Sequence, residues 1–325
     1  MIEVQKLSKF YGQRKAIDEI SFTVEKGEVL GFLGPNGAGK TTTMKILTCF
    51  MPASSGTARV AGFDVFEQPL EVKRRVGYLP ETPPVYNDMI VADFLAFKAA
   101  LHGIKGPDAK KAVGSALENC GLSQVGKRLI GNLSKGYQQR VGIAQAIVHN
   151  PQVLILDEPT IGLDPKQIIE IRGLIKSLAG ERTVVLSTHI LPEVQTTCSR
   201  VLIINEGKIV ASNTLEAISA QLRKGNVISL LVKNNVTGLM GKLRSVNGVA
   251  NVTEEPADGG AAARFVVTAA NGGEIRDAVS EIAVTSGAGL LEIKRESLSL
   301  EEVFLKLTTV EPSGSQAGEP SGGAL

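Results

Sequence analysis

Short blocks of apolar residues recur along the first two thirds of the chain. Val29–Leu33 and Val153–Leu156 contain no charged residue, a pattern typical of strands that are buried on both faces of a parallel sheet. Thr183–His189 is a further apolar block, and it ends in a histidine. Thr41–Thr48 carries apolar residues at helical spacing shortly after the first block. We therefore expect an α/β domain over residues 1–220, in which strands and helices alternate.

Residues 85–135 show a different period, because their apolar residues recur at roughly helical spacing. This spacing predicts a mostly helical lobe within the larger domain. The connection that leads into the lobe carries Pro80, Pro83 and Pro84, whose fixed φ keeps it irregular. The apolar residues that define the helical spacing are Phe94, Leu95, Ala99, Val113 and Leu117.

After about residue 225 the pattern is that of a smaller, separate unit. Its element order, βαββαβ, predicts a small α+β domain of the ferredoxin-like type over residues 225–310. A capping box at Ser299 and Glu302 predicts a closing helix that ends at Leu307. Residues 311–325 are rich in Pro, Gly and Ser, which predicts a disordered tail. The strands are predicted at 227–232, 249–253, 264–267 and 290–293, and the helices at 236–243 and 274–284.

Composition limits the classes of function. The 325 residues are 43% hydrophobic and 21% charged, which suits a globular protein with a sizeable core. The net charge is only +2 and both signs are interspersed, and the small domain offers only Phe265 and Phe304 for base stacking, so nucleic acid is not expected as a partner. Cys49, Cys120 and Cys198 form no close pair and no metal-binding spacing, which indicates reduced thiols in the cytosol. The first residues lack the layout of a secretion signal, and no apolar run approaches the roughly 20 residues that cross a bilayer. A membrane span is therefore not expected in this sequence.

The segment between the first strand and its helix has the pattern G-x-x-x-x-G-K-[ST] of a phosphate-binding loop. Its glycines permit a tight turn that directs backbone N–H groups at an anion, and the helix adds its positive end. Lys40 is expected to contact the β- and γ-phosphates, and the Thr41 hydroxyl to bind Mg²⁺. The alternative interpretation is a glycine-rich turn with a solvated lysine. The other nucleotide contacts predicted in this loop are Gly34, Pro35, Asn36, Gly37, Ala38, Gly39 and Thr42.

Two acidic residues, Asp157 and Glu158, directly follow the second apolar block. Open α/β sheets bind ligands at the carboxyl ends of their strands, so we expect Asp157 to hold Mg²⁺ and Glu158 to activate the attacking water. Two solvated acids that cap a strand are the alternative. His189 ends the next predicted strand, and two adjacent strands would bring it near the γ-phosphate. Asp164 precedes Pro165, as expected of a helix N-cap.

The segment Leu133–Arg140, which reads LSKGYQQR, lies between the phosphate loop and the acidic strand. In this order, the three segments resemble the nucleotide-binding subunits of ABC transporters over about residues 2–220. Ser134 and Gly136 then belong to the signature segment of that family, with Gly136 leading into a helix over residues 138–147. The resemblance further implies that Tyr11 stacks on adenine, that Lys40, Glu158 and His189 act in hydrolysis, that Asp157 and Thr41 direct the metal ion, and that Asp164 belongs to the D-loop.

The sequence departs from the family pattern at two places. The switch loop of the family usually carries glutamine where this chain has Glu81, whose carboxylate can approach Mg²⁺ or its water but donates a hydrogen bond only when protonated. In the signature segment, Lys135 and Tyr137 replace a glycine and a glutamine. This form of the segment resembles the branch of drug, lipid and gliding-motility exporters.

The resemblance implies a reaction and two partners. ATP and Mg²⁺ are the expected cofactors, and ATP is hydrolysed between two chains, because this chain carries one set of motifs. The partners are a second ATPase subunit and an integral membrane permease, which is expected to contact the region from Glu81 to His102. The chain would then be cytoplasmic and peripheral on the membrane. The alternatives are a soluble ABC-type ATPase that is not coupled to transport and a non-hydrolysing, ATP-gated assembly protein.

Overall fold

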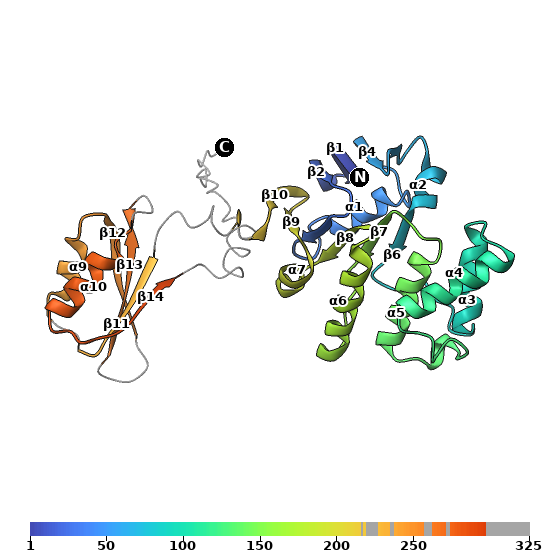
Figure 1. Ribbon diagram of the computed structural model, residues 1–325. Helices are drawn as coiled ribbons and strands as arrows, with labels where there is room; N and C mark the ends of the chain where they lie inside the picture. Colours follow the sequence, from blue (N-terminus) through green and yellow to red (C-terminus); the bar gives the residue numbers. More distant parts are fainter. Residues whose placement is uncertain (216, 219–226, 235–236, 257–261, 271–273, 297–325) are drawn as a thin grey trace, which may run out of the picture. The chain divides into compact units, whose positions relative to one another are not determined.

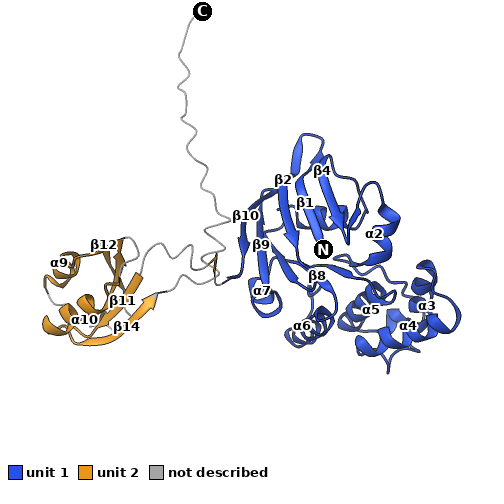
Figure 2. Ribbon diagram, turned by 45° about the horizontal axis from the view of Figure 1, so that its top comes forward, with its two compact units in different colours: residues 1–215, 307–325 blue, residues 216–306 orange. Residues whose placement is uncertain are grey.

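The computed structural model describes residues 1–215, 217–218, 227–234, 237–256, 262–270 and 274–296. These residues form two compact units, one within residues 1–215 and one within residues 216–306 (Figure 2). The closing helix predicted at 299–307 and the tail predicted at 311–325 lie outside the described residues. No helix in the described part of the chain combines the length and apolar character that a bilayer crossing requires.

The larger unit contains a six-stranded sheet that is parallel except for one edge strand (Figure 1). The edge strand β10 runs antiparallel to β9. Strands β3, β8 and β7 are neighbours in this sheet and run parallel, so the carboxyl ends of these three predicted strands lie at one edge. Across the sheet the strands are β10 (Lys208–Asn213), β9 (Arg200–Asn205), β3 (Val29–Leu33), β8 (Thr183–Thr188), β7 (Val153–Asp157) and β6 (Val76–Leu79).

Both faces of this sheet are buried, which explains the uninterrupted apolar blocks of the sequence. In β7, Val153 and Ile155 pack into one hydrophobic core, whereas Leu154 and Leu156 pack into the other. The first core includes helix α1 (Lys40–Leu47). Helices from the opposite face complete the second core: α3 (Val91–Leu101), α4 (Gly106–Asn119), α5 (Lys135–Ile147) and α6 (Pro165–Ala179). The remaining short helices of the unit are α2 (Pro69–Arg75), α7 (Leu191–Thr197) and a 3₁₀ turn at Ile130–Asn132.

A four-stranded antiparallel sheet covers the first core, and the sequence analysis did not predict it. Its central strand β1 contains register shifts, so buried and exposed residues do not alternate regularly along it. The sequence of β1 therefore lacks the period-two alternation that indicates a strand. The strands, in spatial order, are β2 (Arg14–Val24), β1 (Ile2–Tyr11), β4 (Ser55–Val60) and β5 (Phe63–Asp64).

The smaller unit has the predicted βαββαβ order. Its antiparallel sheet has the order β12-β13-β11-β14. Alternate residues of β11 and β13 share one core with α9 and α10, which gives the ferredoxin-like layering of helices on one face of a sheet. Its elements are β11 (Val227–Val232), α9 (Leu239–Arg244), β12 (Val249–Pro256), β13 (Ala263–Ala269), α10 (Arg276–Thr285) and β14 (Leu290–Glu296).

Candidate functional site

The predicted phosphate loop connects β3 to α1 and encloses the ammonium group of Lys40. Lys40 Nζ donates hydrogen bonds to the carbonyl oxygens of Gly34, at 2.8 Å, and Pro35, at 3.2 Å. Gly39 has a φ of 110°, and a Cβ atom there would lie 2.6 Å from the carbonyl oxygen of Ala16. Only glycine fits this position, because any other residue would be strained at this positive φ and its Cβ atom would clash with the Ala16 carbonyl. The loop geometry therefore depends on its neighbour in β2 as well as on its own sequence.

A cavity of about 430 Å³ opens beside this loop, within the size range of small-molecule sites. Three residues that the sequence analysis singled out far apart in the chain line it together: Tyr11, Glu81 and Glu158. Gly34, Pro35 and Ala38, which were predicted as nucleotide contacts, are not among its lining residues. From the loop and helix α1 the cavity is lined by Asn36, Gly37, Gly39, Lys40, Thr41 and Thr42.

The Asp157 carboxyl group lies at the end of β7 and is fully buried. Its Oδ1 accepts hydrogen bonds from the hydroxyl groups of Thr41, at 3.3 Å, and Ser187, whereas its buried Oδ2 has no partner among the described residues. Burial raises the pKa of Asp157 above its usual range, although both hydroxyl groups oppose this shift. A buried carboxylate with an unused oxygen is an unfavourable arrangement that a bound cation would relieve.

The oxygen atoms around Asp157 fit a hard divalent cation such as Mg²⁺. Carboxylate and hydroxyl oxygens are suitable ligands, and Mg²⁺ in phosphate sites commonly uses one or two protein ligands together with water and substrate phosphates. Among the described residues there is no group of three or more His, Cys, Asp or Glu side chains that would hold a metal ion by themselves. Asp157 and Thr41 are therefore the residues that would hold the ion, with the phosphates as further ligands.

Glu158 joins two of the other predicted residues. Its Oε1 lies 3.3 Å from Lys40 Nζ, and its Oε2 lies 2.9 Å from His189 Nδ1. Glu158 is 6% exposed and has a φ of 49°, a left-handed conformation that is uncommon outside glycine. Its amide donates to the carbonyl oxygen of Ser187, at 3.1 Å, so the neighbouring strand β8 supports this turn. The structure thus brings together a carboxylate, an imidazole and the lysine of the loop between β3 and α1.

The chain matches the family model described as "ABC transporter" over residues 17–161. It is 35% identical to the Bacitracin transport ATP-binding protein BcrA of Bacillus licheniformis, over 94% of this chain and 97% of that one. The Linearmycin resistance ATP-binding protein LnrL of Bacillus subtilis (strain 168) is 30% identical over 95% of this chain and 98% of its own length. The chain is an ABC transporter ATP-binding protein. A solved structure described as the ATP-binding subunit of an ABC transporter has a TM-score of 0.62 at 29% identity, and covers 68% of this chain and 93% of that chain.

The family assignment confirms the predicted α/β P-loop fold and makes the chain an ATPase that binds ATP. In this ABC transporter ATP-binding protein, Ser134 and Gly136, which were predicted to belong to the signature segment, line a cavity of about 250 Å³ that is distinct from the cavity beside the phosphate loop. Helix α5 begins at Lys135, three residues before the predicted start, because Ser134 caps it by accepting a hydrogen bond from the Tyr137 amide at 3.5 Å. Gly136 therefore lies inside the helix and does not precede it.

The segment Leu133–Arg140 of this ATP-binding protein packs against helix α6 and the loop that precedes it in the same chain. A Cβ atom on Gly136 would lie 2.7 Å from Gln167 Cδ, so a larger residue there would have to displace the Gln167 side chain. The side chain of Lys135, which replaces a glycine of the usual signature, extends to Gly162. Asp164 caps α6, as predicted, by accepting a hydrogen bond from the Gln167 amide at 2.9 Å.

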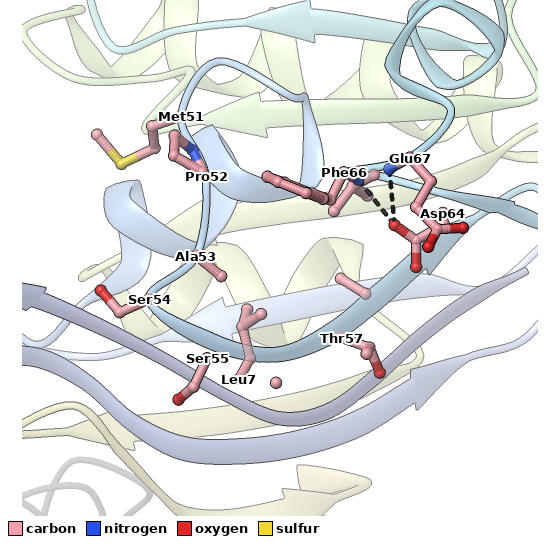
Figure 3. Close-up of a pocket in the computed structure, with 13 residues that line it drawn as sticks. Leu7, Met51, Pro52, Ala53, Ser54, Ser55, Thr57, Asp64, Phe66 and Glu67 are labelled. Atoms are coloured by element: carbon pink, nitrogen blue, oxygen red, sulfur yellow. Dashed lines mark hydrogen bonds between the residues drawn. The ribbon is translucent and has the colours of Figure 1, made fainter.

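Another cavity, of about 270 Å³, lies beside β1 and β4 (Figure 3). None of the residues predicted to bind ATP or Mg²⁺ or to act in hydrolysis lines it. In its wall, Asp64 Oδ1 accepts hydrogen bonds from the amides of Phe66, at 2.8 Å, and Glu67, at 3.1 Å (Figure 3). Its carboxylate is thus occupied in shaping a turn, and the cavity adds nothing to the ATPase site.

Sequence reasoning missed three polar residues of the site: Arg14, Ser187 and Glu193. Arg14 lines the nucleotide cavity from the unpredicted sheet. Ser187 lies inside an apolar strand, where one small polar residue is not a signal in itself. Glu193 follows a proline at the start of the short helix α7, so the sequence suggests only a solvated acid in a first helical turn. The structure instead buries it, and its carboxylate accepts hydrogen bonds from Thr160 and Thr188.

Proposed function

We propose that two copies of this chain, or this chain and a close relative, bind ATP between them and drive transport through a separate membrane permease. The observation that supports this most directly is the separation of Ser134 and Gly136 from the nucleotide cavity of their own chain. The N-terminus of α5 and the Ser134 hydroxyl are suited to an anion, but the phosphate loop of the same chain forms another cavity. A second chain would complete the site.

The chemistry proposed for the site is hydrolysis of ATP to ADP and phosphate. Lys40 and the loop amides bind the phosphates, and Tyr11 stacks on adenine. Glu158 orients the attacking water and accepts its proton, while His189 holds Glu158 and approaches the γ-phosphate. Mg²⁺, held by Asp157 and Thr41, would supply positive charge to the phosphate oxygens. Glu81, which lines the same cavity, would approach that ion or its water.

Asp157 provides a test of the metal site through protein stability. Its raised pKa means that the ionised carboxylate costs stability in the empty site. The protonated carboxyl group stabilises the folded chain below the unfolded-state pKa of about 4, and this stabilisation is lost as pH rises through the higher folded-state pKa. At pH 7 we therefore expect Asp157→Asn to raise the melting temperature of the nucleotide-free chain. In the unchanged chain, MgATP should stabilise the fold more than ATP with EDTA does, because a ligand at a hundredfold excess over its Kd adds up to about 2.7 kcal/mol. Asp157→Asn should abolish this difference between the two ligands. Calorimetry with and without Mg²⁺ would measure both effects, and full retention of the Mg²⁺ effect would contradict the assignment.

A groove of about 480 Å³ between α1, the proline-rich loop and the helical lobe is the proposed contact with the permease. It contains Pro84 and His102, which belong to the region predicted to meet the partner, and Pro80, which directly precedes that region. Phe50, at its edge, is 71% exposed. Its charged lining residues are the lysines Lys45, Lys73 and Lys98, so we infer that it binds an apolar helix of the permease that carries acidic residues.

The two histidines of the groove pack against each other. The rings of His102 and His149 are stacked, with their centroids 3.6 Å apart. Burial lowers the pKa of His149 to about 4, so this ring is neutral at physiological pH. Its Nε2 lies 3.1 Å from the carbonyl oxygen of Val76, which ties the end of the lobe helix α3 to the core through the stacked pair. A neutral pair leaves the lysines as the charges that a partner would meet.

Affinity purification from detergent-solubilised membranes tests the proposed partner. We expect a permease with several membrane spans to co-purify with the tagged chain, and Lys98→Glu to reduce its yield about tenfold by placing like charges opposite each other. Lys110→Glu makes the same charge change on the exposed side of the lobe helix α4 and should leave the yield unchanged. If no membrane protein co-purifies and the chain remains in the soluble fraction, the alternative of an uncoupled soluble ATPase is supported.

The cellular place and cargo of the system follow as further proposals. We propose that the chain lies on the cytoplasmic face of the membrane, where ATP is available to it. The printed names of the relatives BcrA and LnrL refer to bacitracin transport and linearmycin resistance. On that basis we propose export of an antibiotic or similar drug as the function of the complete transporter.

A further inference from the structure

A buried carboxylate that no motif includes contacts residues close in sequence to the proposed hydrolytic residues. Glu193 is in the first turn of α7, which packs against α6 and β8 (Figure 1). The residue is only 1% exposed. Removing a carboxylate from water is costly unless hydrogen bonds or charges compensate it. Its burial therefore requires partners, and their position along the chain indicates what Glu193 does.

Both oxygens of the Glu193 carboxylate accept hydrogen bonds from threonine hydroxyl groups. Thr160 Oγ1 donates to Oε1, and Thr188 Oγ1 donates to Oε2 at 2.6 Å. The Arg172 guanidinium group on α6 lies 3.8 Å from Oε1 and supplies a positive charge. Hydrogen bonds to a charged acceptor are roughly twice as strong as neutral ones, so the carboxylate holds both hydroxyl groups firmly.

The two threonines lie next to the proposed catalytic residues. Thr160 follows Glu158 by two positions, after the end of β7, and Thr188 directly precedes His189, at the end of β8. The Thr188 hydroxyl also accepts a hydrogen bond from the Ile190 amide, at 3.0 Å, so it fixes the backbone on both sides of His189. One carboxylate thus joins the loops that follow two adjacent strands.

We propose that Glu193 is a positioning residue for hydrolysis. It holds the loops that carry Glu158 and His189 in the relative position at which these two side chains contact each other. Glu158 Oε2 and His189 Nδ1 lie 2.9 Å apart. Each loop is attached to a different oxygen of the same carboxylate, so a shift of either loop would require breaking one of these hydrogen bonds. This inference rests on the proposed roles of Glu158 and His189.

Glu193 is separate from the residues that are proposed to bind ATP. It does not line the nucleotide cavity. The described hydrogen-bond partners of Lys40 and Thr41 are likewise other residues: the loop carbonyls for Lys40 and Asp157 for Thr41. A change at Glu193 should therefore act on the rate of the hydrolytic step and leave ATP affinity nearly unchanged.

The first test is a comparison of kcat with ATP affinity in the full chain. Glu193→Gln keeps the size of the side chain but replaces one acceptor oxygen by a donor and removes the charge. We expect kcat for phosphate release to fall about tenfold, while the Kd for a fluorescent ATP analogue stays within about twofold. Thr188→Val and Thr160→Val, which each remove one of the two hydroxyl groups, should produce the same pattern. Thr196→Val is the matched control and should leave kcat unchanged. Among the described residues, the Thr196 hydroxyl bonds to two carbonyl oxygens and one hydroxyl, all within its own helix.

The second test separates positioning from general support of the fold. If Glu193 acts through His189, Glu193→Gln should lower kcat in the wild-type background but have little further effect in the His189→Ala background. A merely structural role would lower the rate by the same factor in both backgrounds. Thermal unfolding of each variant identifies any that fail to fold, and the single-hydroxyl variants then replace Glu193→Gln in the cycle.

The outcomes distinguish this inference from the proposed function. Full turnover in His189→Ala and Glu158→Gln would refute the roles of those residues, and the inference with them. Reduced turnover in both, with wild-type kcat in folded Glu193→Gln, would overturn only the role of Glu193. A loss of ATP affinity equal to the loss of kcat would also overturn it, because positioning of the hydrolytic pair predicts no such loss.

Discussion

Replacing Glu158 by glutamine should lower the rate of ATP hydrolysis by about a hundredfold or more while ATP still binds. Glutamine keeps the size of the side chain and its contact distance to Lys40 and His189, but its amide does not accept a proton from water. ATP should then persist between two chains, since the γ-phosphate that joins them is not cleaved. Phosphate release measures the rate, and light scattering after size exclusion in MgATP measures the dimer.

The control for this prediction is a glutamine substitution at a surface acid. Glu71 pairs with Arg74 and Arg75 on α2, away from the nucleotide cavity. Glu71→Gln should hydrolyse ATP at the wild-type rate and show no trapped dimer. Wild-type turnover in Glu158→Gln would exclude it as the base. A monomeric Glu158→Gln chain at saturating MgATP, both alone and with its permease, would contradict the shared site.

Replacing Lys40 by alanine should weaken ATP binding by about a hundredfold, or about 3 kcal/mol, because charge-assisted bonds to the phosphates are lost. Lys40 is 5% exposed and its ammonium group is held among the carbonyl oxygens of Gly34 and Pro35. The side chain thus already points into the loop that is proposed to receive the phosphates. Titration of a fluorescent ATP analogue measures the change in Kd.

Two further variants make the Lys40 result specific. Lys40→Met keeps the length and apolar stem of the side chain, so it separates the loss of charge from the loss of packing. It should bind ATP as weakly as Lys40→Ala does. Lys176→Ala removes a lysine from the last turn of α6 and should leave the Kd unchanged. Unchanged affinity in folded Lys40→Met would mean that the loop does not bind the phosphates through this residue.

The parts of the fold that could be predicted are those with a simple period. The blocks of β3, β7 and β8 are apolar because both faces of the sheet are buried, and the structure confirms these three strands. The smaller unit was predicted in element order because its strands alternate: in β13, Ala263, Phe265, Val267 and Ala269 face the core while the residues between them do not. The first antiparallel sheet could not be predicted, since the register shifts of β1 interrupt its alternation.

The site shows a similar division. Residues in sequence motifs were predictable because phosphate binding constrains short, contiguous segments, and the structure places Lys40, Glu158 and His189 in contact. Arg14 and Glu193 could not be predicted, because their positions in the site depend on tertiary contacts with no fixed spacing in the chain. Helix α5 begins three residues before its predicted start, because Ser134 caps it and Lys135 and Gly136 are already helical.

The ion pair between Lys40 and Glu158 has a consequence for the order of events at the site. Before ATP arrives, the acid that is proposed to act on water is neutralised by the lysine that is proposed to bind phosphate. An incoming triphosphate competes for that lysine with a larger negative charge, and the carboxylate then loses its resting partner. The entry of the substrate would thus free the base to act on water, and without ATP the base would remain paired with the lysine.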